Sequence, residues 1–139
     1  MMLQYATPDF VTAVMRHPRV WGVVREDGIS PLDFSYQEGA LYFQLGSFGF
    51  VLIRPVTRTM SEIHVATARG GRWVKEAVMA CIAEVAQRGI RKLMAPIGDW
   101  NKAAIRLAVA CGFSEEGRVS GAYVRDGVPR AMVLMGRTL

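Results

Sequence analysis

Cysteine and histidine are scarce in this chain of 139 residues, which contains only Cys81, Cys111, His17 and His64. Two lone cysteines exclude the disulfide framework of a small secreted domain, and they show no C-x-x-C metal spacing. Both lie within apolar helical patterns, so we expect reduced core residues. The histidines are far apart in sequence, and we predict no metal site.

Long apolar runs, low-complexity segments and internal repeats are also missing. No stretch of 18 apolar residues and no signal peptide occurs, so the sequence predicts a cytoplasmic protein without a membrane span. Hydrophobic residues make up 51% of the chain, enough for a real core. A chain of this length is typical of one domain, which we expect to cover residues 1–139.

The charge is positive, with a formal net charge of +5 and a pI of about 9.7. This balance permits an anionic ligand but does not identify one. Most of the cations are scattered along the sequence, and no nucleic-acid motif is present. Binding to nucleic acid or to a membrane is therefore not expected.

The first half of the chain predicts one helix and three strands. Thr7 is a suitable N-cap with Pro8 at the first helical position, and His17-Pro18 is expected to end that helix. Residues 19–39 read as mostly loop. Strands are predicted over residues 41–45 and 48–53, joined by a tight turn at residues 46–47, and over residues 61–66.

The second half predicts two helices, one strand and a hairpin. Apolar periodicity indicates a helix over residues 71–88, a strand over residues 91–96 and a second helix from Asp99 or Asn101 to Cys111. A hairpin turning at residues 126–127 closes the chain. The fold class predicted is α/β, α+β-like, with a central and mostly antiparallel mixed sheet flanked by helices.

The segment Arg69-Gly70-Gly71 lies between a strand and the long helix. A glycine-containing turn before a helix leaves free backbone N–H groups at the positive end of the helix dipole, which favours an anion. Arg69, Arg72 and Lys75 gather at this end. Either they face a negative ligand or their side chains extend into solvent.

These landmarks resemble the GNAT N-acetyltransferase family, whose Arg/Gln-x-x-Gly-x-Gly/Ala loop binds the pyrophosphate of coenzyme A. The likeness covers residues 61–139 and includes Asn101-Lys102-Ala103-Ala104 and Gly112-Phe113 followed by Gly117. The early His-Pro, the loop Glu26-Asp27-Gly28 and the Glu-x-His strand also resemble short GNAT-like proteins of phages and prophages.

The resemblance implies acetyl-CoA as co-substrate and a set of cofactor-binding residues. They are Val65, Ala66, Arg69, Gly70, Gly71, Arg72, Trp73, Val74, Asn101 and Ala104. Arg72 and Val74 take two positions that are normally glycine or alanine, where small residues let backbone N–H groups approach the phosphates. Asn101 is also a good N-cap, and an aromatic residue near a helix start, such as Trp73, is more often a packing residue.

The catalytic residues that we predict are Glu62, His64 and Tyr123. Glu62 and His64 are two residues apart on a strand, so they face the same side and could serve as the base. A polar pair that only packs the strand is an equal alternative. The family often uses a tyrosine as acid where this chain has Ala108, which makes Tyr123 or Cys111 a conceivable substitute.

The function implied is acetyl-CoA-dependent N-acetylation of a primary amine by direct attack in a ternary complex. The alternative is a GNAT-like binding module, or a phage structural or assembly module, that has lost catalysis. Edge strands of a small sheet also make a homodimer conceivable.

Overall fold

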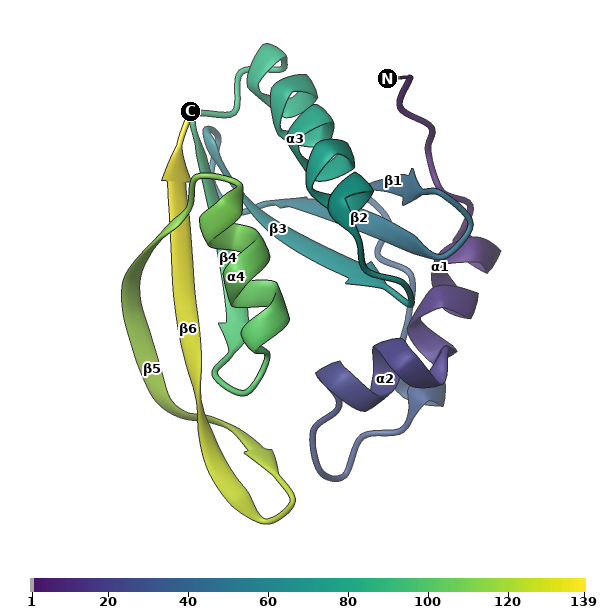
Figure 1. The fold of residues 1–139 in the computed structure, drawn as a ribbon, viewed down its shortest axis with the longest axis vertical. Helices are drawn as coiled ribbons and strands as arrows, with labels where there is room; N and C mark the ends of the chain where they lie inside the picture. Colours follow the sequence, from purple (N-terminus) through teal and green to yellow (C-terminus); the bar gives the residue numbers. More distant parts are fainter. Residues whose placement is uncertain (1) are drawn as a thin grey trace.

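The chain folds into one six-stranded sheet with helices on both faces (Figure 1). The computed structural model describes residues 2–139. Its helices are α1 (Pro8–Arg16), α2 (Pro18–Val24), the 3-10 helix η1 (Pro31–Asp33), α3 (Arg72–Gln87) and α4 (Lys102–Ala110). Its strands are β1 (Leu41–Leu45), β2 (Gly49–Pro55), β3 (Met60–Thr67), β4 (Lys92–Gly98), β5 (Ser114–Arg125) and β6 (Val128–Thr138).

The strand order is β1-β2-β3-β4-β6-β5, and only the β3–β4 pair is parallel. This confirms the predicted α/β class with a mostly antiparallel sheet. The caps and turns were read correctly from local residues. Thr7 accepts a hydrogen bond from the Phe10 N–H, and Asp126 and Gly127 take positive φ angles in the last hairpin turn.

The prediction that residues 19–39 are mostly loop was wrong for residues 19–24, which belong to α2. His17 ends α1 and also caps α2, because its Nδ1 accepts a hydrogen bond from the Arg19 N–H at 3.1 Å. Pro18 then occupies the first helical turn, where a missing N–H costs nothing. Val20 anchors the helix, since only 3% of its surface is exposed.

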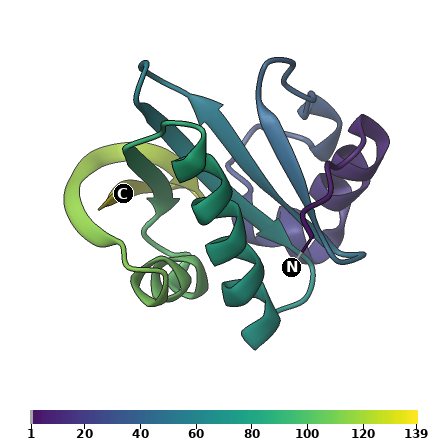
Figure 2. The ribbon, with the colours of Figure 1, turned by 90° about the horizontal axis from the view of Figure 1, so that it is seen from above.

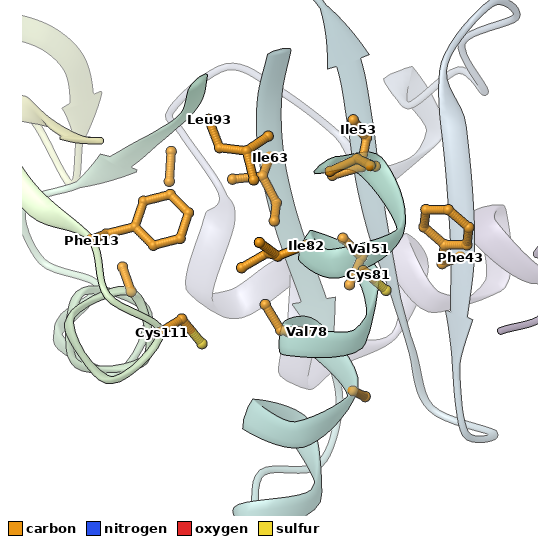
Figure 3. Close-up of a cluster of buried hydrophobic side chains, with 14 of the residues drawn as sticks. Phe43, Val51, Ile53, Ile63, Val78, Cys81, Ile82, Leu93, Cys111 and Phe113 are labelled. Atoms are coloured by element: carbon orange, nitrogen blue, oxygen red, sulfur yellow. The ribbon is translucent and has the colours of Figure 1, made fainter. Parts of the chain in front are cut away.

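The larger core lies between the sheet and the helices α3 and α4, which cover the same face (Figure 2). Figure 3 shows Val78, Cys81 and Ile82 of α3 pointing at the apolar side chains of β2 and β3. The helix α3 is amphipathic, and the residues it buries recur at the spacing of one helical face.

A smaller core lies on the opposite face, under α1 and α2. It packs Val11 and Val20 against Tyr42, Phe50 and Leu52 of β1 and β2. This second core covers the β1–β3 half of the sheet.

The two parallel strands separate soon after they begin. Met60–Glu62 of β3 pairs with Lys92–Met94 of β4, and no further pair joins the two strands in the described chain. Beyond this short ladder β3 stays paired with β2 through Thr67, and β4 stays paired with β6 through Gly98. Figure 1 shows the strands starting side by side and diverging toward their carboxyl ends.

Pro96 gives a chemical reason for this separation. The Asp99 N–H donates to the Ala131 carbonyl beside β6, so by alternation the even residues of β4 direct their backbone groups toward β3. A continued ladder would need a hydrogen bond from the Pro96 nitrogen to the Ile63 carbonyl, and proline has no N–H. The strand predicted to end at Pro96 instead continues to Gly98.

The end of α2 is tied to the last hairpin near the open ends of β3 and β4. The Trp100 Nε1–H donates to the Val23 carbonyl at 2.6 Å, and the Arg125 guanidinium donates to the Gly22 and Val23 carbonyls. The Asp27 carboxylate accepts from the N–H groups of the hairpin turn, residues 126 and 127. These contacts join segments from 77 to 103 residues apart in the chain.

Replacing Gly98 by alanine is expected to destabilise the fold by about 1–3 kcal/mol, the usual cost of overpacking. A Cβ at this position would overlap the ring of Trp100, which its hydrogen bond to Val23 holds in place. Gly117→Ala is the matched control, because a Cβ there meets no atom within 4 Å. Urea unfolding of both variants measures the difference, and equal midpoints would contradict the packing described for Trp100.

Candidate functional site

The separated strands leave two backbone edges facing each other. The Ala68 N–H donates to the Phe48 carbonyl beside β2, so by alternation Ile63, Val65 and Thr67 direct their backbone groups toward β4. The last pair of the ladder, Glu62 with Met94, uses the Ile63 N–H, so within the described chain the Ile63 carbonyl and the backbone groups of Val65 and Thr67 have no partner on β4. An extended ligand with amide groups can add to such an edge as a strand would.

The loop that follows β3 opens directly into the N-terminus of α3. Gly71 is its N-cap, with a φ of 135°, and no side chain among residues 2–139 caps the helix. A Cβ on Gly71 would lie 2.9 Å from Cδ1 of Trp73, so glycine is required both by conformation and by space. In the part of the chain that the structure describes, the N–H groups of residues 70–73 have no hydrogen-bond acceptor.

The three cations predicted at this loop differ in their surroundings. The Arg69 guanidinium lies over the Phe48 ring, 4.0 Å from its centroid. It lines a hollow of about 270 Å³ together with His17 and Arg19. Arg72 and Lys75 are exposed, and neither forms an ion pair with any residue from 2 to 139. Arg72 is therefore free to meet a phosphate.

The side chain of Val74 does not occupy the space at the start of α3 where a phosphate would bind. Its side chain is 4% exposed and belongs to the core between the sheet and α3. Trp73 packs partly against the same core, and its Nε1–H donates to the Gly70 carbonyl at 3.3 Å. The loop therefore keeps unbonded N–H groups, although Arg72 and Val74 are larger than the glycine or alanine of the family pattern.

The other predicted cofactor residues border the open edges. Val65 directs its backbone toward β4, whereas Ala66 pairs with Phe50 and contributes its side chain to the smaller core. The Asn101 side chain accepts a hydrogen bond from the Ala104 N–H at 3.2 Å, which confirms Asn101 as the N-cap of α4. A contact of Asn101 or Ala104 with a cofactor stays a prediction.

Glu62 and His64 lie on one face of β3, as predicted, and they contact each other. His64 Nε2 is 3.1 Å from Glu62 Oε2, and the same oxygen accepts a hydrogen bond from Nη2 of Arg54 on β2. Burial alone would raise the pKa of the Glu62 carboxyl. The hydrogen bonds and charges of His64 and Arg54 outweigh that effect and hold the pKa below its ordinary value.

Tyr123 reaches this same region from β5. Its ring packs edge-on against Trp100, with the centroids 5.1 Å apart. Burial raises the pKa of the Tyr123 hydroxyl, and the negative charges of Glu26 and Glu62 raise it further. A hydroxyl in this environment stays protonated at neutral pH and can donate.

The cysteines do not enter the site. Cys81 and Cys111 are buried in the larger core, and burial raises the pKa of the Cys81 thiol to about 12. Burial likewise raises the pKa of Cys111, against the opposing charges of Lys75 and Arg137. Ala108, at the position where the family often has tyrosine, is 8% exposed and packs in this core.

Two further features concern the whole described chain. Over residues 2–139, no helix is long and apolar enough to cross a membrane. No three metal-ligating side chains of the histidine, cysteine, aspartate and glutamate types come together within that range.

Arg54 and Trp100 are site residues that sequence reasoning missed. Arg54 is the direct cross-strand partner of Glu62, so an opposite-charge pair would have been found once the register of β2 on β3 was known. Trp100 and Arg125 gave no local signal, because their partners on α2 lie 77 and about 100 residues away.

The comparisons with known proteins identify the fold. No protein-family model matches the chain, and no curated protein matches its sequence. Among solved structures, it resembles the ribosomal-protein-alanine N-acetyltransferase of Brucella melitensis, with a TM-score of 0.76, 20% identity and 100% of both chains covered. It also resembles an acetyltransferase of the GNAT family from Streptococcus pneumoniae, with a TM-score of 0.72, 18% identity and 99% of both chains covered.

A third structure that resembles the chain contains ligands. It is spermidine N-acetyltransferase from Vibrio cholerae in complex with CoA and spermine, with a TM-score of 0.79 and 14% identity. The match covers 99% of this chain and 94% of that one. At these identities the similarity shows the fold, which is the GNAT fold.

Replacing Glu62 by glutamine is expected to lower the free energy of unfolding by about 1–2 kcal/mol at pH 7, because hydrogen bonds to a charged acceptor are lost. Since the pKa of Glu62 is lowered from 4.5, its contribution is present above that pH and disappears as the pH falls through the folded-state value. The stability curves of the two proteins should therefore approach each other as the pH falls below 4.5.

Urea unfolding between pH 3 and pH 8 measures both curves. The matched control is Glu38→Gln, an exposed position whose carboxylate forms no ion pair within residues 2–139. Parallel curves for wild type and Glu62→Gln down to pH 3 would contradict the ion pairs described.

Proposed function

We propose that this protein is an acetyl-CoA-dependent N-acetyltransferase that modifies a primary amine by direct attack in a ternary complex. The observation that carries the proposal is the meeting of two features at one end of the sheet. The free backbone edges of β3 and β4 open there, and only four residues separate the end of β3 from the uncapped N-terminus of α3. An extended amide-containing chain ending in phosphates fits both features.

The residues that would hold the phosphates are the N–H groups of residues 70–73 and the Arg72 side chain. A charged donor and several backbone donors at the positive end of a 16-residue helix suit a pyrophosphate. Backbone groups of Val65, with contacts from Asn101 and Ala104, would hold the amide-containing arm. The CoA bound to the spermidine N-acetyltransferase of the same fold supports this choice of ligand.

Acetyl-CoA supplies an activated acetyl group as a thioester, and in the transfer a C–N bond forms while the C–S bond breaks, its electron pair leaving on sulfur. The Glu62–His64 pair accepts one proton from the acceptor's ammonium group, which frees the nitrogen lone pair. The Tyr123 hydroxyl gives a proton to the leaving sulfur, and the second proton lost by nitrogen restores that hydroxyl. One proton is released to solvent overall.

Direct attack is favoured over a cysteine-bound intermediate. Both cysteines are buried, and their raised pKa values keep the thiols protonated. A thiol must be exposed and ionised to act as a nucleophile. The likeness of the chain to short phage and prophage proteins stays a prediction, and the acceptor amine is to be found by screening.

Reversing the charge of Arg72 tests the phosphate loop. Arg72→Glu is expected to weaken acetyl-CoA binding at least about tenfold, because one charge-assisted hydrogen bond to phosphate contributes roughly 1.5–3 kcal/mol. Calorimetric titration of acetyl-CoA into both proteins gives the two dissociation constants. ATP and desulfo-CoA serve as control ligands.

Arg91→Glu is the matched control protein, since Arg91 is an exposed arginine at the far end of α3 and its loss changes the net charge equally. Its affinity for acetyl-CoA should stay within about twofold of wild type. Equal weakening by both reversals would mean a nonspecific charge effect. No binding at millimolar acetyl-CoA would refute the proposal and favour a module that has lost catalysis.

A further inference from the structure

Arg54, Glu62 and His64 form a connected cluster in which one oxygen receives two donors. Arg54 and Glu62 are direct partners in the β2–β3 register, and Arg54 Nη2 donates to Glu62 Oε2. His64 Nε2 lies 3.1 Å from that same oxygen. The Glu62 side chain is the least exposed of the three, at 22%, against 43% for Arg54 and 36% for His64.

The chemistry of the carboxylate determines which nitrogen of His64 carries the proton. The lowered pKa of Glu62 means that its carboxylate is ionised at neutral pH and can only accept hydrogen bonds. A contact between Nε2 and this oxygen therefore requires a proton on Nε2. In the neutral ring the lone pair is then on Nδ1, which is the atom left to accept a proton.

The same contacts make Glu62 a weak base. A carboxylate that already receives an arginine and a histidine, with its pKa held low, has little tendency to take a further proton near neutral pH. An imidazole is the side chain suited to exchanging protons in that range. The geometry therefore separates two roles that the residue types alone leave open.

We propose that His64 is the base of the transfer through its Nδ1 atom, and that Arg54 and Glu62 are positioning residues that fix its tautomer. This inference rests on the proposed acetyltransfer. In the step, an N–H bond of the acceptor's ammonium breaks and an N–H bond forms on Nδ1. A neutral amine with a free lone pair results, together with an imidazolium whose charge lies beside the Glu62 carboxylate and which returns its proton to solvent.

Arg54 has a specific task in this arrangement. Its Nη2 atom donates to Glu62 Oε2 from the β2 side, which holds the carboxylate in its orientation toward His64. Without Arg54, Glu62 would keep a single partner, and its carboxylate would be free to turn away from His64 Nε2. The charged or titratable groups around the cluster are Arg54 on β2, Glu62 on β3, Tyr123 on β5 and Glu26 in the loop after α2.

Nitrogen-15 NMR of the histidine rings tests the tautomer without any substrate. At pH 8 the wild-type protein should show His64 with its proton on Nε2, and a His17→Asn variant assigns the signals because the chain has only two histidines. In Arg54→Gln the His64 signals should move toward a mixture of both tautomers, and Arg54→Lys should restore part of the wild-type pattern. Arg58→Gln, in the β2–β3 turn, is the matched control and should change nothing.

Kinetics with an acceptor found by screening test the base. His64→Gln should lower kcat at least about 100-fold, the usual contribution of a general base. Arg54→Gln should lower kcat about tenfold with an unchanged KM for acetyl-CoA. A circular dichroism melt of each variant checks that it is folded.

The outcomes separate this inference from the proposed function. A proton on Nδ1 in the wild type, or identical His64 signals in wild type and Arg54→Gln, would overturn the positioning roles. A larger loss of kcat in Glu62→Gln than in His64→Gln would make Glu62 the base. A third outcome is the predicted tautomer in a protein that does not bind acetyl-CoA. It would overturn the acetyltransfer and the base assignment, and it would leave the described hydrogen bonds intact.

Discussion

The three-residue parallel ladder between β3 and β4 is the constraint on which the rest of the molecule depends. It joins the β1–β3 half of the sheet to the β4–β6–β5 half. Because it is so short, the two strands can separate beyond Glu62 and Met94 while each keeps its outer partner. The separation costs hydrogen bonds at the inner edges, and Pro96 could not have made one of them. A sheet that stayed closed would have no free edge in its interior and no place for a ligand between β3 and β4.

The two cores lie on opposite faces of this divided sheet. The gap between β3 and β4 is therefore bordered by chemically different groups on its two faces. The helices α3 and α4 fill one face with apolar side chains, so the N–H groups at the start of α3 come next to the free edge of β3. On the other face, Arg54, Glu62 and His64 lie beside a region that Trp100, Tyr123 and Arg125 border. Backbone donors suited to an anion and a cluster of hydrogen-bonded charged side chains thus belong to different faces of the same separated strands. This arrangement suits the proposed acyl transfer between two bound molecules.

Local residues predicted much of this structure. Thr7-Pro8, Gly71, Gly89, Asn101 and Asp126-Gly127 carry their own conformational signals, and the helix and strand limits they predict agree with the structure to within a few residues. The helix α2 was missed because a proline such as Pro18 can either end a helix or begin one. The burial of Val20, which the sequence does not report, is what favours a second helix here. The pairing of β3 with β4 and the contacts of Arg54, Trp100 and Arg125 join distant segments. No periodicity or cap in the sequence reports such contacts, although the proline within β4 was a signal that the ladder would stop.

The central claim is that the inner edge of β3 is open in the free protein and is used by the ligand. Amide hydrogen exchange at Val65 and Ala66 tests it most directly, because these neighbours direct their N–H groups to opposite sides of β3. Without ligand, the Val65 amide should exchange at least about tenfold faster than that of Ala66, since it lacks a hydrogen bond of roughly 1.4 kcal/mol. Saturating acetyl-CoA should slow Val65 and leave Ala66 unchanged. Equally slow exchange at both amides in the free protein would mean that the strands are closed there, and would contradict the account.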